Sequence, residues 1–272
     1  MEILENISLA PFTTLKIGGP ARFFVKAGTE VDVVEAFEWA ENNGLELFVL
    51  GGGSNVLVAD EGFEGLVLQV AITAKVQSPK PKVEITAGAG VDWDEFVEYC
   101  VSQNLAGVEC LSGIPGFVGG TPVQNVGAYG QEVSETIVSV RCFDRRSKKI
   151  VELSNAECGF SYRKSIFNST ERERYIVLAV KYALIRGGAP KIVYKDLKEY
   201  FGGREPSLRE TREAVLSIRR AKSMVIDEAD PNSRSAGSFF KNPIVPDVKF
   251  DEVRSMGFEN VPNFAAGDGF VK

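Results

Sequence analysis

Residues 113–130 read GIPGFVGGTPVQNVGAYG, a run in which six of 18 residues are glycine and two are proline. This composition costs conformational entropy on folding unless the backbone itself has to approach another group. An irregular structural loop is the alternative explanation. Glycines at this density predict a backbone that lies close to a bound ligand.

A second glycine run, Gly51-Gly52-Gly53-Ser54-Asn55, directly follows the apolar run 45–50. Consecutive glycines let backbone N–H groups turn toward an anion, and Ser and Asn add side-chain donors. No Lys-Ser/Thr pair follows, so the run is not a P-loop. Residues 56–58 are expected to continue as an apolar strand, so the Rossmann fingerprint is not met either. A tight turn explains two glycines more easily than three followed by Ser-Asn. Two such loops together suit a long, flat cofactor with a diphosphate.

The first 70 residues read as a small α/β unit. Thr29-Glu30-Val31-Asp32 is a capping box that opens an amphipathic helix ending at Gly44. The apolar runs 45–50 and 66–70 predict strands. A proline-flanked break at 78–81 follows.

The rest of the chain reads as α+β. Strands are predicted at 83–88, 137–143, 149–153 and 175–185, and helices at 92–103 and from Ser207 through Lys222. Residues 186–190, which read RGGAP, are expected to form a domain boundary. The basic stretch 141–149 lies between two apolar runs and predicts a solvated β-hairpin tip.

Composition excludes several classes of protein. The net charge is -6 and the pI is about 5.1, which argues against nucleic acid as a partner. No apolar run reaches the roughly 18 residues of a membrane span, and the acidic start does not resemble a targeting peptide. We therefore expect a cytoplasmic protein. The cysteines lack C-x-x-C spacing, which favours buried thiols over a metal site or disulfides: Cys100, Cys110, Cys142 and Cys158.

Two further segments carry polar side chains suited to chemistry. Residues 160–165 read FSYRKS and include Arg163, and residues 236–243 read AGSFFKNP and include Ser238. Taken singly, such an arginine is usually a solvated surface group, and such a serine is usually part of a turn. The chain has no histidine, so acid–base chemistry has to use Ser, Tyr, Lys, Arg or a carboxylate.

Together and in this order, the four segments and the opening FTTLKIGG at 12–19 resemble the UDP-N-acetylenolpyruvoylglucosamine reductase (UDP-N-acetylmuramate dehydrogenase) family. The resemblance covers nearly the whole chain. It implies an α+β fold with a vanillyl-alcohol-oxidase-type FAD-binding region in two subdomains, 1–70 and 71–188. A substrate-binding domain, 189–272, would follow.

The family's chemistry implies non-covalent FAD and NADPH. NADPH reduces the flavin, whose N5 delivers hydride to C3 of the enolpyruvyl ether and so makes UDP-N-acetylmuramate for peptidoglycan synthesis. Negative charge left at C2 and the carboxylate then needs stabilisation and a proton. The partner is a small UDP-sugar, with no nucleic acid and no membrane, and a monomer is expected.

Site residues follow from the resemblance. Ser238 resembles the proton donor to C2, and Arg163 resembles the cation beside the substrate carboxylate. Substrate contacts would come from Tyr129, Tyr162, Lys222 and Asn242. No metal is implied. FAD would contact Gly51, Gly52, Gly53, Ser54, Asn55, Gly113, Ile114, Pro115, Gly116, Gly119, Gly120, Asn125, Gly127 and Ala128.

The chain departs from the family pattern at its C-terminus. The family continues with a segment that includes a catalytic glutamate, and nothing after Gly269 matches it, so a C-terminal truncation is expected. Glu252 and Glu259 lie in no matching motif. One alternative is a flavin-binding fragment with impaired turnover, and another is a different flavin oxidoreductase on the same fold. Tyr194 fits either a substrate-covering loop or a core aromatic at a helix start.

Overall fold

The computed structural model describes residues 1–77, 82–258 and 261–272, which separate into two compact units. The first unit is Met1–Ala236 and the second is Gly237–Lys272. The predicted break at 78–81 and the carboxylate of Glu259 lie outside the described residues. The domain boundaries after residues 70 and 188 stay predictions.

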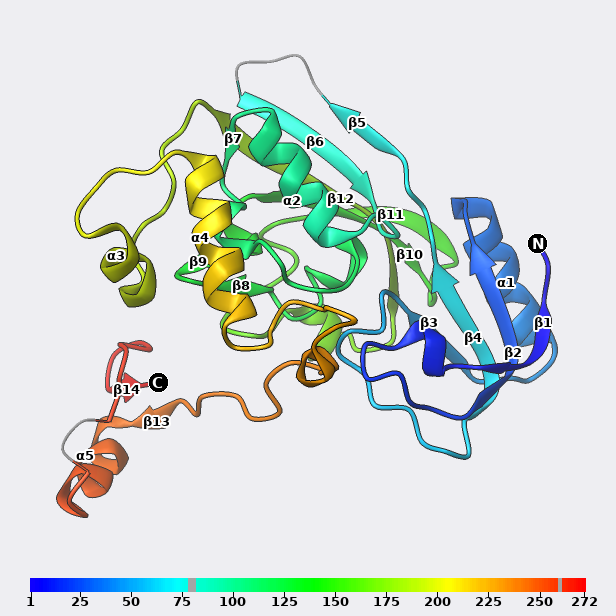
Figure 1. Cartoon of the computed structure of the whole chain (residues 1–272). Helices are drawn as coiled ribbons and strands as arrows, with labels where there is room; N and C mark the ends of the chain where they lie inside the picture. The colour runs from blue at the N-terminus through cyan, green and yellow to red at the C-terminus, as the bar shows by residue number, and fades with distance from the viewer. Residues whose placement is uncertain (78–81, 259–260) are drawn as a thin grey trace. The chain divides into compact units, whose positions relative to one another are not determined.

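A mixed sheet with the order β1-β2-β4-β3 forms the N-terminal part of the first unit (Figure 1). Its strands are β1 (Leu4–Ser8), β2 (Pro20–Ala27), β3 (Leu47–Leu50) and β4 (Phe63–Val70). β4 pairs in parallel with both β2 and β3. Six consecutive residues of β4 are buried, as expected for a strand covered on both faces.

Helix α1 (Glu30–Asn42) packs against β2 and β4 and begins at the predicted capping box. The Thr29 side chain accepts a hydrogen bond from the Asp32 amide at 3.1 Å, and the Asp32 carboxylate accepts one from the Thr29 amide at 2.9 Å. These reciprocal bonds satisfy two amides that the helix leaves unpaired at its first turn.

An antiparallel sheet with the order β11-β10-β12-β6-β5 follows, and the short strand β7 pairs with β12. The strands are β5 (Lys75–Gln77), β6 (Lys82–Gly88), β7 (Leu105–Ala106), β10 (Ile137–Asp144), β11 (Lys149–Ser154) and β12 (Tyr175–Arg186). The predicted helix after β6 is α2 (Trp93–Ser102). The rings of Phe37 on α1 and Phe143 on β10 meet at 5.2 Å, so one core continues between the two sheets.

The first unit continues with the short hairpin β8 (Gly127–Ala128) and β9 (Gln131–Glu132), then α3 (Lys195–Phe201) and α4 (Leu208–Arg220). Short 3-10 helices lie at Ala10–Phe12, Glu109–Leu111, Val118–Gly120, Val133–Glu135, Ile166–Asn168 and Pro231–Ser233. The second unit contains β13 (Val245–Pro246), α5 (Asp247–Ser255) and β14 (Phe270–Val271), with β13 and β14 paired.

One local prediction is confirmed and one is wrong. β10 and β11 form the predicted hairpin around the basic stretch. Residues 56–58, however, form no strand. Val56 and Val58 pack against a cluster that includes Leu50 and Val67, so their apolar side chains are used for loop packing rather than for strand pairing.

The cysteines are free and buried, as predicted: Cys100, Cys110, Cys142 and Cys158. Burial raises the pKa of the Cys100 thiol to about 12, so this thiol is not a reactive nucleophile. Across the described ranges, the helices lack the length and apolar character required to cross a membrane.

Candidate active site

The two glycine-rich segments lie against each other in the first unit. A Cβ atom on Gly52 would lie only 2.7 Å from Cα of Gly116, so glycine is required for this approach. Asn55 Nδ2 donates to Gln124 Oε1 at 3.3 Å across the same junction. Residues far apart in the sequence therefore form one surface.

Packing explains some of these glycines and leaves others unexplained. Gly53 has a φ of +65°, and a Cβ there would lie 1.9 Å from the Phe12 carbonyl oxygen. A Cβ on Gly119 would likewise clash with Ala89. Gly51 and Gly120 lie outside the left-handed region, and apart from their immediate neighbours along the chain no described atom is within 4 Å of their Cβ positions. Open space beside the backbone at these two positions is what the close approach of a ligand requires.

The first loop also presents a run of backbone donors. In the part of the chain that the structure describes, the amides of Gly52, Gly53, Ser54 and Asn55 donate to no acceptor. Successive N–H groups of this kind form a concave anion site. A cavity of about 170 Å³ adjoins Gly52 and is also lined by Lys16, which adds a positive charge. Amides, open glycines and a cation together fit the diphosphate of a flat cofactor.

Replacing Gly51 with valine is expected to weaken FAD binding by about tenfold or more, because the new side chain would occupy the open space. The unfolding midpoint of the apoprotein should stay close to wild type. Fluorescence titration with FAD measures the affinity. The matched variant Gly119→Val, whose Cβ would lie 2.6 Å from that of Ala89, should instead lose about 1–3 kcal/mol of stability. Unchanged FAD affinity in Gly51→Val would contradict this placement of the cofactor.

Arg163 is held against the second glycine loop. Its guanidinium donates to the carbonyl oxygens of Asn125, at 3.2 Å, and Gly127. A Cβ on Gly127 would lie 2.9 Å from Arg163 Nη1, so glycine makes room for the guanidinium. The φ of Arg163 is +53°, which costs about 1 kcal/mol or more for a residue with a Cβ. Local strain and two carbonyl acceptors thus fix a positive charge beside the loop.

Asn125 is buried, and its side chain forms hydrogen bonds with other residues of the chain. Nδ2 donates to Glu132 Oε2 at 2.8 Å and to the Ser161 carbonyl at 3.0 Å, and Oδ1 accepts from the Ser134 amide at 3.2 Å. These bonds connect the loop to the β8–β9 hairpin and to the FSYRKS segment. Any contact of Asn125 with a cofactor would therefore come from its backbone.

Tyr129, Tyr194 and Lys222 lie in one neighbourhood. The Tyr129 ring packs edge-on against Tyr194 with centroids 5.5 Å apart. Lys222 Nζ forms an ion pair with Asp196 at 2.8 Å, and that bond raises the Lys222 pKa. Burial raises the pKa of Tyr129 despite the nearby charges of Arg219 and Lys222.

Tyr194 directly precedes α3, which agrees with the predicted position at a helix start. Its side chain is half-exposed, at 40%, so it is not a core aromatic. A role over the substrate stays a prediction.

Sequence reasoning missed Arg219, which joins the second glycine loop to this neighbourhood. Arg219 is 9% exposed and donates to the carbonyls of Gly113, at 3.3 Å, and Met224, at 2.8 Å. Burial lowers the Arg219 pKa, and the nearby Tyr129 acts in the opposite direction. One signal was available: Arg212 and Arg219 fall on the buried face of α4 at a spacing of seven residues. Arginines are rarely buried unless they are paired, so buried arginines on a helix face indicate that the face forms hydrogen bonds or ion pairs.

Asp94 anchors the start of the second glycine loop and was also missed. Its carboxylate accepts from the Gly113 amide at 2.6 Å and from both Nη atoms of Arg212 at 2.5 and 2.8 Å. Burial alone would raise the pKa of Asp94, but the hydrogen bonds from Arg212 and Gly113 outweigh it and lower the pKa. The geometry of the loop therefore depends on an ionised carboxylate on α2.

Replacing Asp94 with asparagine is expected to destabilise the protein by about 1–3 kcal/mol at pH 7. This loss is smaller than for a fully buried ion pair, because the pair of Asp94 and Arg212 is partly exposed to solvent. Because the folded pKa is lowered, the stabilisation is complete above the ordinary value of 3.8 and is lost as pH falls through the folded pKa. Denaturant unfolding at several pH values measures the gap between variant and wild type. A gap that stays constant down to pH 2 would contradict this assignment.

Comparison with known proteins bears on the chemistry of this site. A family model described as FAD binding domain matches residues 21–154, which include both glycine segments. A UDP-N-acetylenolpyruvoylglucosamine reductase from Thermobifida fusca is 44% identical over 280 residues, covering 98% of this chain and 78% of that protein. The Streptomyces coelicolor enzyme of the same name is 44% identical over 280 residues, covering 99% of this chain and 72% of that protein.

The chain belongs to the UDP-N-acetylenolpyruvoylglucosamine reductase family.

A solved structure agrees with this assignment. The crystal structure of UDP-N-acetylenolpyruvylglucosamine reductase from Thermus caldophilus matches with a TM-score of 0.64 at 28% identity, covering 89% of this chain and 76% of that one. The family resemblance and the α+β fold with an FAD-binding region, both predicted from sequence, are confirmed. The vanillyl-alcohol-oxidase type of that region stays a prediction. As a member of the UDP-N-acetylenolpyruvoylglucosamine reductase family, the chain is an enzyme, a flavoprotein oxidoreductase that binds FAD.

The predicted site residues are divided between the two units. Arg163, Tyr129 and Lys222 lie in the first unit, whereas Ser238 and Asn242 lie in the second. Within the second unit both side chains are exposed, on the segment that precedes β13. Their roles stay predictions.

Proposed function

We propose that the chain catalyses the NADPH-dependent, FAD-mediated reduction of UDP-N-acetylenolpyruvoylglucosamine to UDP-N-acetylmuramate, a step of peptidoglycan precursor synthesis. The observation that carries the proposal is the meeting of the two glycine loops beside an arginine whose position is fixed. The names of the two bacterial relatives support the choice of substrate.

The two loops are the proposed FAD site. The amides from Gly52 to Asn55, together with Lys16, fit the diphosphate, and the open backbone at Gly51 and Gly120 suits a flat group. When bound, FAD supplies the hydride that is added to C3 of the substrate's enolpyruvyl group and is itself reduced by NADPH. The residues of the chain bind and orient FAD and the substrate, and they provide charge.

Arg163 is proposed to stabilise the negative charge that develops at C2 and on the substrate carboxylate. A guanidinium carries five N–H donors, more than the two carbonyl oxygens of Asn125 and Gly127 use. The remaining donors can form a fork with a carboxylate. Because the guanidinium is already fixed, little reorganisation is needed as charge develops.

Ser238 is proposed to give its hydroxyl proton to C2. A serine is a weak acid, but an enolate-like species is a strong enough base to take that proton. Tyr129, Tyr162, Lys222 and Asn242 are proposed to hold the sugar nucleotide, with Lys222 at the diphosphate. Asp196 keeps Lys222 protonated, which suits that role.

A steady-state assay tests the proposal. NADPH absorbance should fall only when both FAD-loaded protein and UDP-N-acetylenolpyruvoylglucosamine are present, and mass spectrometry should find a product two hydrogens heavier. With D₂O as solvent, deuterium should appear at C2, since an exchangeable hydroxyl supplies that proton. NADPH oxidation that is independent of the sugar nucleotide would overturn the proposal.

We further propose a cytoplasmic monomer whose partner is this UDP-sugar, with no nucleic-acid or membrane partner. The formal charge of -6 supports the lack of a nucleic-acid partner. Light scattering of the purified protein tests the monomer directly, and a mass twice that of the 29.6 kDa chain would contradict it.

A further inference from the structure

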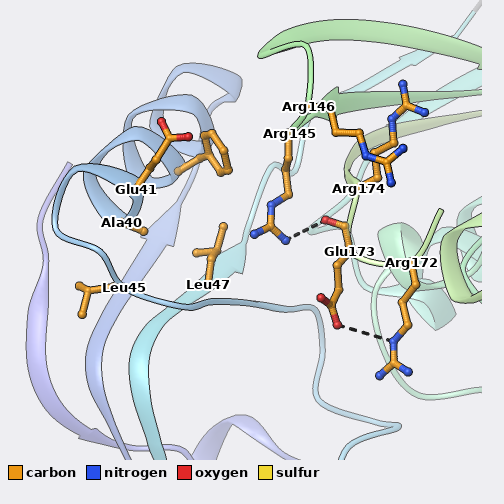
Figure 2. A pocket seen from close by; sticks show the side chains of 10 residues that line it. Ala40, Glu41, Leu45, Leu47, Arg145, Arg146, Arg172, Glu173 and Arg174 are labelled. Carbon is orange, nitrogen blue, oxygen red and sulfur yellow. Dashed lines mark hydrogen bonds and ion pairs between the residues drawn. The ribbon is translucent and has the colours of Figure 1, made fainter.

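A cavity of about 370 Å³ lies in the first unit, and the proposed reaction does not use it (Figure 2). One side is mostly apolar, formed by Phe37 and Ala40 of α1, by Leu45 in the loop that follows α1, and by Leu47 at the start of β3. Its volume falls at the small end of the range for small-molecule sites, about 300–1,000 Å³.

This cavity is separate from the glycine loops. Leu47 begins β3, and Gly51 follows the other end of the same strand. At about 3.3 Å per residue, Leu47 and Gly51 lie roughly 13 Å apart along the chain. A molecule in the cavity would therefore face the opposite end of β3 from the proposed flavin diphosphate.

The other side of the cavity is formed by guanidinium groups. Four arginines line it: Arg145, Arg146, Arg172 and Arg174. Arg174 is paired with Asp144 at 2.9 Å and with Glu171 at 3.1 Å, and Arg146 is paired with the same glutamate at 3.0 Å. These two arginines have their charges balanced by neighbouring carboxylates.

The acidic side chains at the cavity are also balanced. Glu41 forms an ion pair with Lys148 at 2.5 Å, and Glu173 forms one with Arg172 at 3.7 Å. Neither carboxylate is left to neutralise another cation.

Arg145 differs from these charged groups because, among the described residues, it is in no such ion pair. It donates to the backbone carbonyl of Glu173 at 2.8 Å, and its guanidinium lies 5.6 Å from the centroid of the Phe37 ring. Within residues 1–77, 82–258 and 261–272, no ion pair joins it to a carboxylate. In Figure 2 its guanidinium points toward the apolar side that includes Leu47. A half-buried, uncompensated cation thus faces an apolar surface.

We propose that this cavity binds a small organic anion, with a phosphate or carboxylate group on Arg145 and a flat apolar body against Phe37 and Leu47. An arginine fork matches either head group. The apolar side distinguishes such a molecule from a free inorganic ion.

Calorimetric titration of the FAD-loaded protein with phenyl phosphate tests the site. Arg145→Gln should weaken binding by about tenfold or more, because a charge-assisted bond is lost. Leu45→Trp, which fills the apolar side and changes no charge, should weaken it as well. Arg209→Gln, an exposed arginine of α4, should leave the affinity unchanged. Lys222→Ala should also leave it unchanged, which excludes binding of the probe at the proposed substrate site.

Three outcomes would overturn the inference. Phenyl phosphate could fail to bind at millimolar concentration, or it could bind Arg145→Gln as tightly as wild type. Inorganic phosphate could bind as tightly as phenyl phosphate and ignore Leu45→Trp, which would show that the apolar side plays no part. Because Leu45→Trp does not alter Arg145, it tests the site even where the arginine variant is unstable.

Discussion

Arg163→Lys is expected to slow reduction of the sugar nucleotide by about 10²- to 10³-fold, the loss seen when one preorganised donor to a developing negative charge is removed. Lysine keeps the charge but cannot both hold the carbonyls of Asn125 and Gly127 and form a fork with the substrate. Stopped-flow measurement of flavin reoxidation by the substrate isolates this step.

The same variant should still be bleached by NADPH at a rate close to wild type, because the proposed role of Arg163 begins with the sugar nucleotide. Arg186→Lys, at the exposed end of β12, is the matched control and should behave as wild type in both steps. If Arg163→Lys slows both steps equally, or neither, the guanidinium does not act on the substrate's charge.

Ser238→Ala is expected to lower the rate of substrate reduction by about 10²- to 10⁴-fold, the range that a positioned proton donor contributes. The substitution removes one hydroxyl from an exposed segment, so the unfolding midpoint should not change. Single-turnover kinetics with prereduced protein measure the effect.

Ser255→Ala provides the control for Ser238→Ala. Ser255 lies in the same unit and donates to the Glu252 carbonyl in its own helix, so its loss should leave the rate unchanged. Full activity in Ser238→Ala would assign the proton to another donor and contradict the proposed role.

Local sequence signals predicted local structure well. The capping boxes at Thr29 and Ser207 open α1 and α4 where expected, because a cap is made by residues three apart and needs no distant partner. The strand predicted at residues 56–58 was wrong because a strand depends on distant residues. The apolar pattern of 56–58 suits a strand, but a strand also requires a neighbour to pair with, and these side chains pack in a loop instead.

The arrangement of the candidate site was only partly predictable. The two glycine runs could be recognised as unusual, yet their contact at Gly52 and Gly116 depends on how two sheets come together. The ion pair between Asp94 and Arg212 joins helices far apart in the sequence. The left-handed backbone of Arg163 has no signal in its residue type, because arginine is not enriched there.

The most direct test of the account is an anaerobic titration of the FAD-loaded chain, followed by flavin absorbance. NADPH should bleach the flavin, and addition of UDP-N-acetylenolpyruvoylglucosamine should restore the oxidised spectrum and yield UDP-N-acetylmuramate. Bleaching that the sugar nucleotide does not reverse would contradict the proposed reaction and leave a flavin-binding chain without turnover.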